Sequence, residues 1–313
     1  MDRVAPEPVL SQALVAQLLA SEELPLRQNA WPAATAAVII RRGAIVASHI
    51  ERHLSCTRTM DRARRLIDAC EERGESFPSG MVVIADEVRA SQGRFHRAWY
   101  APRGGLWLTL VLVDTLIPSL SHLYPLAAGV ACCEALQSYG LPARVKWVND
   151  VLLHGRKVAG ILTEAHMGRS GERYILLGIG INANNAVFPP ELTDRAVAMA
   201  QVLPAPVDLE LLAARLCVKL TWNLGLLLQE EERLLASDQG PEAALAQGHA
   251  LLTAWLAVSD TVGRRVLFGY DVVERPEYEA RVLGLDVHGF LRLAPLPGGP
   301  PRTETAGEII YLD

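Results

Sequence analysis

The stretch KWVNDVLLHGRKVAGILTE, residues 146–164, places charged side chains inside an otherwise apolar segment. Apolar runs on either side of a glycine-containing turn predict two strands, over residues 143–153 and 156–167. Side chains at even spacing on a strand share a face, so Lys146 and Asp150 are expected on one face of the first strand. A tight hairpin would then bring the start of the second strand back toward the first.

Lys157 begins that second strand, so the hairpin would place its ammonium near Asp150. A lysine beside a carboxylate at a protein surface is an ion pair that contributes little to stability. The same arrangement also serves as a phosphate-binding lysine next to a carboxylate that holds Mg²⁺. Because the surrounding segment is so apolar, the charges favour the functional interpretation.

The composition predicts a folded protein of one large domain or two modest ones. The chain has 313 residues, of which 50% are hydrophobic and 21% charged, with a net charge of −5. The negative charge argues against broad nucleic-acid binding. The five cysteines form no CxxC motif, which argues against structural zinc and favours buried thiols in the cytoplasm. We expect no signal peptide and no membrane span, because no apolar run reaches about 18 residues without charge or proline.

The chain divides into three predicted regions. Residues 1–45 are expected to form an N-terminal extension that packs on the main body, and they are short and insufficiently basic for a winged DNA-binding domain. The alternative is a degenerate regulatory domain. Residues 46–258 form the predicted main domain. Over residues 259–313, apolar and polar residues alternate between Gly and Pro breaks, which predicts a small antiparallel barrel.

Helices and strands alternate irregularly in the main domain, which predicts a mixed sheet flanked by helices. One helix is expected from Thr59, as N-cap, to Gly74. Two further helices are expected over residues 123–140 and 206–235, and strands over residues 81–88, 106–113 and 173–184.

The segment SQGRFHRAW, residues 91–99, has the composition of an anion-binding loop. Glycine allows backbone N–H groups to approach an anion, and the guanidinium groups of Arg94 and Arg97 can bind phosphate or carboxylate in a bidentate manner. The alternative is an exposed, solvated loop.

The segment GIGIN, residues 178–182, indicates close approach of a ligand or another backbone to a strand, or alternatively tight packing. It is not a dinucleotide fingerprint, because it lacks a third glycine and a following helix. The sequence has no GxxxxGK[ST], GxSxG or HExxH motif, and its eight histidines do not cluster.

Each motif is weak alone, but their order and spacing resemble the biotin protein ligases, within the wider biotin/lipoate ligase fold. The likeness runs from about residue 50 to the C-terminus through TMDRA, ADEVRASQGRFHRAW, GGLWLTLVL, KWVNDVLLHGRKVAGILTE, LLGIGINAN and the final GRRV and GEI segments. The Lys-Trp-x-Asn-Asp segment followed by Gly-Arg-Lys-Val-Ala-Gly-Ile-Leu is the most specific part.

The resemblance implies an α+β fold with a mixed sheet flanked by helices and a small C-terminal SH3-like barrel. It also implies a two-step, AMP-forming ligase reaction with ATP and Mg²⁺. Biotin and ATP would first give biotinyl-5′-AMP, and a lysine of a biotin carboxyl-carrier protein domain would then accept the biotin. The resemblance leaves a homodimer open, and the composition argues against membrane and DNA partners.

The resemblance also implies roles for individual residues. The catalytic residues would be Lys157, Arg94 and Asp150, with Asp150 also near Mg²⁺. The acid-binding residues would be Arg58, Thr59, Met60, Val88, Gln92, Gly93, Arg94, Lys157, Gly160 and Gly178. The ATP-binding residues would be Arg97, Trp99, Lys146, Asn149, Asp150 and Asn182.

The sequence departs from the family pattern mainly at the acid-reading end. Arg58 stands where the family has serine, Val88 where it has glutamine, and Gln92 where it has the first arginine of its Gly-Arg-Gly-Arg loop. The last change removes a charged bidentate donor. Two alternatives therefore remain: a ligase of the same fold for lipoate, octanoate or another acid, and a non-catalytic ligand-binding homologue. Val148 replaces a proline, and because valine suits a strand the placement of Asp150 is expected to survive.

Overall fold

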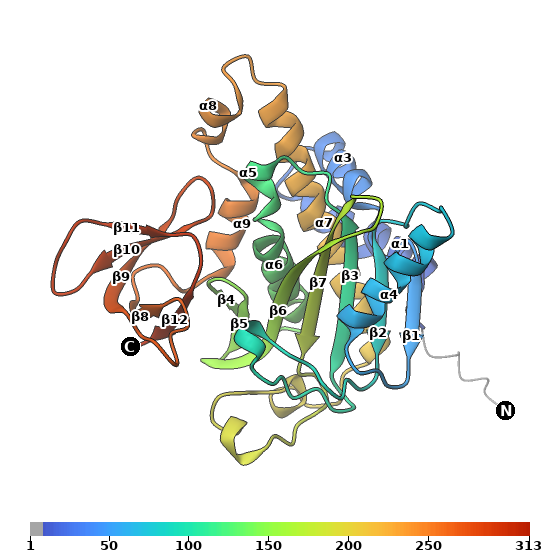
Figure 1. Cartoon of the computed structure of the whole chain (residues 1–313), viewed down its shortest axis with the longest axis horizontal. Helices are drawn as coiled ribbons and strands as arrows, with labels where there is room; N and C mark the ends of the chain where they lie inside the picture. Colours follow the sequence, from blue (N-terminus) through green and yellow to red (C-terminus); the bar gives the residue numbers. More distant parts are fainter. Residues whose placement is uncertain (1–8) are drawn as a thin grey trace.

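The computed structural model describes residues 9–313 as a mixed sheet flanked by helices, followed by a separate five-stranded sheet (Figure 1). This arrangement confirms the predicted fold class. The segment 1–8, over which no signal peptide is expected, lies outside the described residues.

The main sheet has seven strands in the order β1-β2-β3-β7-β6-β5-β4. Strands β1 and β2 pair in parallel, and the other neighbours are antiparallel. The strands are β1 (Ile50–His53), β2 (Met81–Ala85), β3 (Leu106–Val113), β4 (Arg144–Lys146), β5 (Asp150–Leu153), β6 (Arg156–Met167) and β7 (Arg173–Ile181). Strand β3 is buried on both faces, which explains its almost uninterrupted run of apolar residues.

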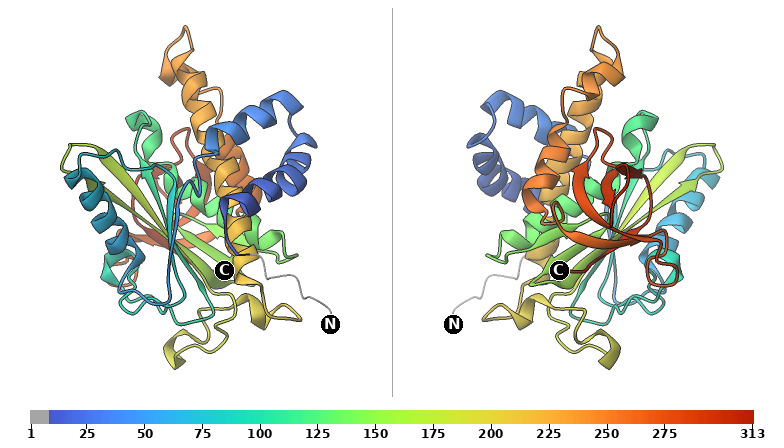
Figure 2. Two further views of the ribbon diagram at one scale, coloured as in Figure 1. Left: turned by 90° about the vertical axis from the view of Figure 1, so that its right-hand side faces the viewer. Right: turned by 90° about the vertical axis from the view of Figure 1, so that its left-hand side faces the viewer.

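Helix α4 (Thr59–Glu72) covers part of one face of the sheet, and the remaining large helices cover the other (Figure 2). Its residues Met60, Ala63 and Ile67 pack with Val111 of β3 and Leu176 of β7. The opposite face carries α6 (Tyr124–Gln137), α7 (Leu209–Leu235) and α9 (Ala250–Val258). The shorter helices and helical turns are α5 (Pro118–Ser121), α8 (Pro241–Leu245), η2 (Arg94–His96), η3 (Pro190–Leu192) and η4 (Met199–Gln201).

The N-terminal segment forms α1 (Gln12–Leu18), the π-helical turn η1 (Leu19–Glu23), α2 (Leu24–Gln28) and α3 (Ala33–Gly43). These elements pack against α7 (Figure 2). At the α3–α7 crossing, a Cβ atom on Gly43 would lie 1.8 Å from the carbonyl oxygen of Thr221, so only glycine fits there. The segment therefore packs on the main body, as expected.

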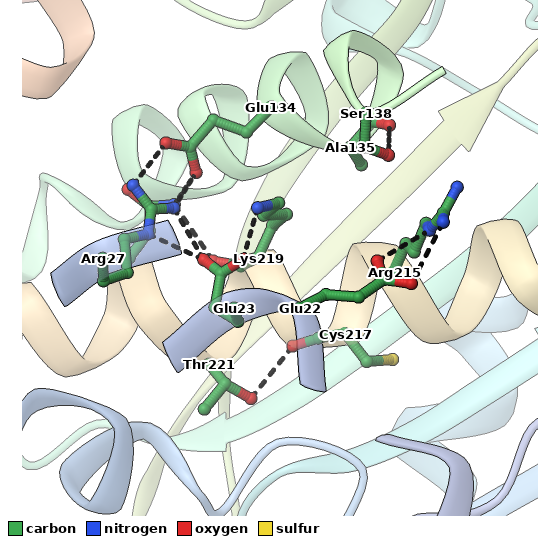
Figure 3. A network of polar contacts seen from close by, with 11 residues as sticks. Glu22, Glu23, Arg27, Glu134, Ala135, Ser138, Arg215, Cys217, Lys219 and Thr221 are labelled. Carbon is green, nitrogen blue, oxygen red and sulfur yellow. Dashed lines mark hydrogen bonds and ion pairs between the residues drawn. The ribbon is translucent and has the colours of Figure 1, made fainter. Parts of the chain in front are cut away.

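A network of buried charges fixes this N-terminal segment in place (Figure 3). Arg27 donates to Glu23 at 2.8 Å and makes a bidentate pair with Glu134 of α6 at 2.8 and 2.6 Å. Lys219 of α7 also pairs with Glu23, whose side chain is only 1% exposed. We call Glu23, Arg27, Glu134 and Lys219 the seam network, because they join the N-terminal helices to the main domain.

The C-terminal sheet has the order β11-β10-β9-β8-β12 and is antiparallel throughout. Its strands are β8 (Arg265–Gly269), β9 (Tyr278–Leu285), β10 (Leu291–Pro295), β11 (Arg302–Glu304) and β12 (Glu308–Tyr311). Alternate residues such as Val266, Phe268, Ala280 and Val282 are buried, as the period-two pattern requires. The boundaries at residues 45 and 258 remain predictions, although both fall between elements.

One expectation from the sequence is wrong in detail. The N-cap of α4 is Arg58, with no side-chain hydrogen bond, and Thr59 is the first helical residue. Helix α7 is long and apolar enough by composition to cross a membrane. However, 83% of its most apolar window is buried inside the protein, so packing accounts for that composition.

Candidate functional site

A cavity of about 600 Å³ lies on the α4 face of the sheet, beside the start of that helix. Its floor contains glycines: Gly160 of β6 and Gly180 of β7 are cross-strand partners, and Gly178 lies opposite Leu162. Residues of the loop before β3, of β4 to β7 and of the C-terminal sheet form its walls. The sheet thus places no side chain of its own at these three floor positions.

All of the site residues predicted from the sequence line this one cavity. They are Arg58, Thr59, Met60, Val88, Gln92, Gly93, Arg94, Arg97, Trp99, Lys146, Asn149, Asp150, Lys157, Gly160, Gly178 and Asn182. Segments that are more than a hundred residues apart in the chain therefore meet at one place, while the role of each residue stays a prediction.

Three charged side chains meet at one end of the cavity. Lys157 Nζ lies 2.5 Å from Asp150 Oδ1, and Lys146 Nζ lies 3.1 Å from Asp150 Oδ2. Burial alone would raise the pKa of Asp150, but attraction to Lys157 and Lys146 outweighs it and holds that pKa well below its usual range. We call these residues the cavity triad. With two cations and one anion, it carries a net positive charge that suits an anionic ligand.

The expected single strand over residues 143–153 is wrong. The structure has two strands, β4 and β5, with a turn at residues 147–149 that contains Val148, and the Trp147–Val148 peptide bond is cis. Lys146 and Asp150 are consequently cross-strand partners rather than neighbours on one strand face. Directly opposed side chains on paired strands lie close together, so their contact is preserved by a different geometry.

Lys157 reaches Asp150 through the hairpin, as expected. His154 and Gly155 both have positive φ values, of 50° and 76°, and connect β5 to β6. Two successive residues with positive φ form the tight turn that matches the twist of paired strands. The hairpin is therefore the element that positions Lys157.

The glycines on the floor make room for side chains of the protein itself. A Cβ atom on Gly160 would lie 3.1 Å from Trp99, one on Gly180 would lie 2.9 Å from Trp99, and one on Gly178 would lie 2.9 Å from Met60. The Lys157 ammonium also lies 5.0 Å from the centre of the Trp99 ring system. Among the described residues, the groups that approach these glycines most closely are side chains such as Trp99 and Met60, which agrees with the alternative of tight packing.

The loop over residues 91–99 contacts the C-terminal sheet. Arg94 donates to the carbonyl oxygen of Gly307 at 2.7 Å, and Arg97 donates to Glu308 Oε2 at 2.8 Å and pairs with Asp271. Burial lowers the pKa of Arg94, while the attraction of Glu308 and Asp150 opposes that change. Glu308 belongs to the GEI segment that the sequence analysis singled out, but no local pattern pairs it or Asp271 with an arginine so distant in the chain.

Two asparagines hold backbone in place at the cavity wall. The side-chain amide of Asn149 donates to the carbonyl oxygen of Ile161 at 2.8 Å, and the Ile161 N–H donates back to the backbone oxygen of Asn149. Asn182 accepts from Asn185 at 2.9 Å. Both asparagines therefore stabilise the strand ends that carry the floor and the cavity triad.

The residues at the other end of the cavity are less polar. Thr59 accepts a hydrogen bond from the hydroxyl of Thr109 at 2.8 Å. Met60, Leu162 and Gly178 complete this region, and Arg58 is its long polar side chain. Val88 is buried in a cluster with Trp99 and Trp107. The cavity thus has a charged end and a mainly apolar end.

The residues present do not fit a protein-built Mg²⁺ site. Both oxygens of Asp150 contact lysine ammonium groups, which compete with a divalent cation for the same lone pairs. Within residues 9–313, no group of three or more His, Cys, Asp or Glu side chains is placed to hold a metal ion. Asp150 fits the role of a partner to two lysines rather than that of a metal ligand.

Comparison with known proteins shows a likeness over part of the chain. Residues 60–182 match the model of the Biotin/lipoate A/B protein ligase family. The chain is 34% identical over 144 residues to the bifunctional ligase/repressor BirA of Bacillus subtilis, and that match covers 45% of this chain and 44% of the relative. The chain thus spans less than half of that relative's length.

Two further likenesses cover more of the chain. The biotin–[acetyl-CoA-carboxylase] ligase of Mycobacterium tuberculosis is 29% identical over 244 residues, covering 74% of this chain and 79% of the relative. The biotin protein ligase from Aquifex aeolicus, solved in complex with biotin and ATP, superposes with a TM-score of 0.64 at 21% identity, covering 84% of this chain and 98% of that one. Residues 60–182 are therefore similar to the Biotin/lipoate A/B protein ligase family, and the chain shares the fold of the biotin protein ligase from Aquifex aeolicus.

Proposed function

We propose that the protein is an ATP-dependent biotin protein ligase, which forms biotinyl-5′-AMP and transfers biotin to a lysine of a carrier-protein domain. The observation that carries this proposal is the cavity triad, with two ammonium groups on one carboxylate at the end of a glycine-floored cavity. The relatives named as biotin ligases support the choice of acid.

The first step joins two anions, so the site must neutralise both. An oxygen of the biotin carboxylate forms a bond to the α-phosphorus of ATP, and the bond from that phosphorus to the bridging oxygen breaks to release pyrophosphate. The positive triad attracts the two reactants, and Asp150 holds Lys157 and Lys146 in fixed positions. Catalysis of this type comes from orientation and from prepositioned positive charge.

The second step breaks the mixed anhydride. The amine nitrogen of the acceptor lysine forms an amide bond to the biotinyl carbonyl carbon, and AMP leaves with the electron pair of the broken bond. Such an adenylate hydrolyses if water reaches it, and the loop over residues 91–99 lies over the cavity with Trp99 packed on its floor. We assign this loop the role of excluding water.

The same-fold alternative is a ligase for another carboxylic acid. Val88 is a buried lining residue whose side chain offers no hydrogen bond, and Gln92 supplies no charge. Both features suit an acid with a plain alkyl tail at least as well as biotin. The acid dependence of the reaction separates these two proposals.

The test is pyrophosphate release from ATP supplied with Mg²⁺ in the presence of biotin, lipoate or octanoate. Biotin is expected to support release in the wild-type protein, and Lys157→Met is expected to lower the rate by about 10²–10³-fold. Arg156→Met is the matched control, because Arg156 is the adjacent cation and does not line the cavity among the described residues. If octanoate supports pyrophosphate release and biotin does not, the protein is a ligase for another carboxylic acid. If none of the three acids supports release, the protein is a non-catalytic binding protein.

The binding partners and the cellular compartment of the protein are also proposals. All five cysteines are free and buried, which supports a reducing compartment such as the cytoplasm. A carrier-domain lysine as acceptor, a homodimer and the absence of DNA binding stay predictions. Incubation with a biotin carrier domain, followed by detection of protein-bound biotin, tests the acceptor.

A further inference from the structure

Strand β4, which carries Lys146 of the cavity triad, is an edge strand of the main sheet. It has three residues, and within residues 9–313 its one partner in that sheet is β5. An edge strand has backbone groups on its outer side that no strand of the sheet uses. The position of Lys146 therefore depends on what holds the outer side of β4.

Ser259, the C-cap residue of α9, holds that outer side. Its backbone forms a parallel bridge with Val145, and its hydroxyl donates to the backbone carbonyl oxygen of Val145 at 2.9 Å. The N–H of Thr261 donates to the Ser259 hydroxyl oxygen at 3.2 Å. A serine hydroxyl can donate one hydrogen while its oxygen accepts another, so both bonds are made together. Ser259 is thus bonded to the residue that directly precedes Lys146.

The C-terminal sheet holds this segment in turn. Tyr311 of β12 donates its hydroxyl to Asp260 at 3.1 Å, and the hydroxyl oxygen of Thr261 lies 2.6 Å from the same Tyr311 oxygen. Thr261 is fully buried, and Tyr311 lines the cavity. A path of hydrogen bonds through Thr261 and Ser259 therefore joins β12 to β4.

The start of β4 is tied to a different element. The side-chain amide of Gln137, in α6, donates to the carbonyl oxygen of Ala143 at 3.1 Å. Ala143 precedes β4, whereas Val145 is the immediate neighbour of Lys146. Of these two ties, the one made by Ser259 acts closer to the ammonium group.

We propose that Ser259 is a positioning residue, which holds Lys146 in place for binding the phosphates of ATP and makes the charged end of the cavity depend on the C-terminal sheet. The inference rests on the proposed function, in which Lys146 contacts ATP. Ser259 does not line the cavity among the described residues, so it acts through β4 rather than on a reactant. A side chain that binds a ligand needs such support from behind, because its own bonds do not fix the strand that carries it.

The test measures binding of α,β-methylene-ATP, in which the bond that would break is blocked, by calorimetry with and without biotin, and the KM for ATP by pyrophosphate release. Ser259→Ala is expected to raise the Kd of the analogue and the KM for ATP by about 3- to 10-fold, the factor that one hydrogen bond supplies, with little change in the Kd of biotin. Ser259→Thr, which keeps the hydroxyl, is expected to retain the wild-type values. In a Lys146→Met background, Ser259→Ala is expected to change the Kd of the analogue by less than about twofold, because the group that it positions is absent.

Ser48→Ala is the matched control. Ser48 is also a half-buried serine whose hydroxyl donates to a backbone carbonyl oxygen of another segment, that of Ser79 at 2.8 Å, and it does not line the cavity among the described residues. It is expected to lose a similar amount of stability and to leave the Kd of the analogue and the KM for ATP unchanged. Equal Kd values in Ser259→Ala and the wild type, or the same loss with and without Lys146, would overturn the inference.

Failure of the proposed function gives a different result. If the wild-type protein binds the analogue but releases no pyrophosphate with any acid, the proposed function is wrong and the Kd values still decide the role of Ser259. If the wild-type protein does not bind the analogue, both proposals are wrong. If Ser259→Ala does not fold, Ser259→Cys takes its place with the same expected results, because a thiol of similar size donates only weakly.

Discussion

Two ionic networks of this protein contain similar charged residues but differ in net charge and in exposure. The seam network contains two cations, Arg27 and Lys219, and two anions, Glu23 and Glu134, and it lies between packed helices (Figure 3). The cavity triad contains two cations and one anion, and it faces a cavity. Lys219 is 8% exposed at its side chain, whereas Lys157 is 33% exposed.

The two networks differ in charge balance and in access: the seam network is neutral and enclosed, whereas the cavity triad carries a net positive charge and lines a cavity. Every charge of the seam network has a partner within the protein, so the network fixes the N-terminal helices and leaves nothing to bind. The cavity triad has one more positive than negative charge, which suits an anionic ligand. If this interpretation is correct, the same substitution has different consequences at the two places.

The largest expected effect on stability is that of Lys219→Met. Removing this ammonium leaves Glu23 buried with Arg27 as its remaining cation, and breaking a buried pair by deleting one partner costs about 3–5 kcal/mol. Urea unfolding followed by circular dichroism measures this loss. Pyrophosphate release per folded molecule should stay at the wild-type level. A loss of activity at urea concentrations where the variant is still folded would contradict the distinction between the two networks.

A smaller effect, with a defined pH dependence, is expected for Asp150→Asn. The lysines hold the pKa of Asp150 below its unfolded value, so the carboxylate stabilises the folded state above about pH 4 and loses that contribution as the pH falls further. The variant is expected to be less stable by about 2 kcal/mol at neutral pH, because two lysines then face an amide. Urea unfolding near pH 6 and near pH 3 should show the difference shrinking at the lower pH.

Lys157→Met should change the free energy of unfolding by less than about 1 kcal/mol. Asp150 keeps its contact with Lys146 at 3.1 Å, and removal of Lys157 leaves a neutral pair in place of a positively charged group of three. Residues that serve a ligand are often not optimal for stability. Thermal melting compares this variant with Lys219→Met, and an equal loss of stability in both would show that the two networks do not differ in kind.

The sequence predicted the cavity triad better than the seam network, for a physical reason. Lys146, Asp150 and Lys157 are charges within an apolar hairpin, so local pattern and turn chemistry were enough to bring them together. The break between β4 and β5 was missed because the turn at residues 147–149 contains neither glycine nor proline. The pairing of β4 with β5 nevertheless places Lys146 opposite Asp150.

Glu23 shows why the rest was not predictable. It lies in the segment SEELPLRQ, whose charged residues read as a solvated helix surface, yet its carboxylate is buried by residues of α2 and α7. Lys219 is 196 positions away in the chain, and no local pattern encodes that contact. The same limit explains Glu308, which meets Arg97 across 211 positions.

The smallest expected effect comes from the residue next to Glu23. Glu22 pairs with Arg215 at 3.1 Å, but its side chain is 44% exposed, so water and salt screen the attraction. Glu22→Gln should cost less than about 0.5 kcal/mol, whereas Glu23→Gln, one position along, should cost several times more. Urea unfolding at low and high salt measures both, and the loss in Glu22→Gln should vanish at high salt while that in Glu23→Gln persists. Because the two glutamates share local sequence and helix, only their surroundings differ, and equal losses would mean that burial and charge balance do not set the strength of the seam network.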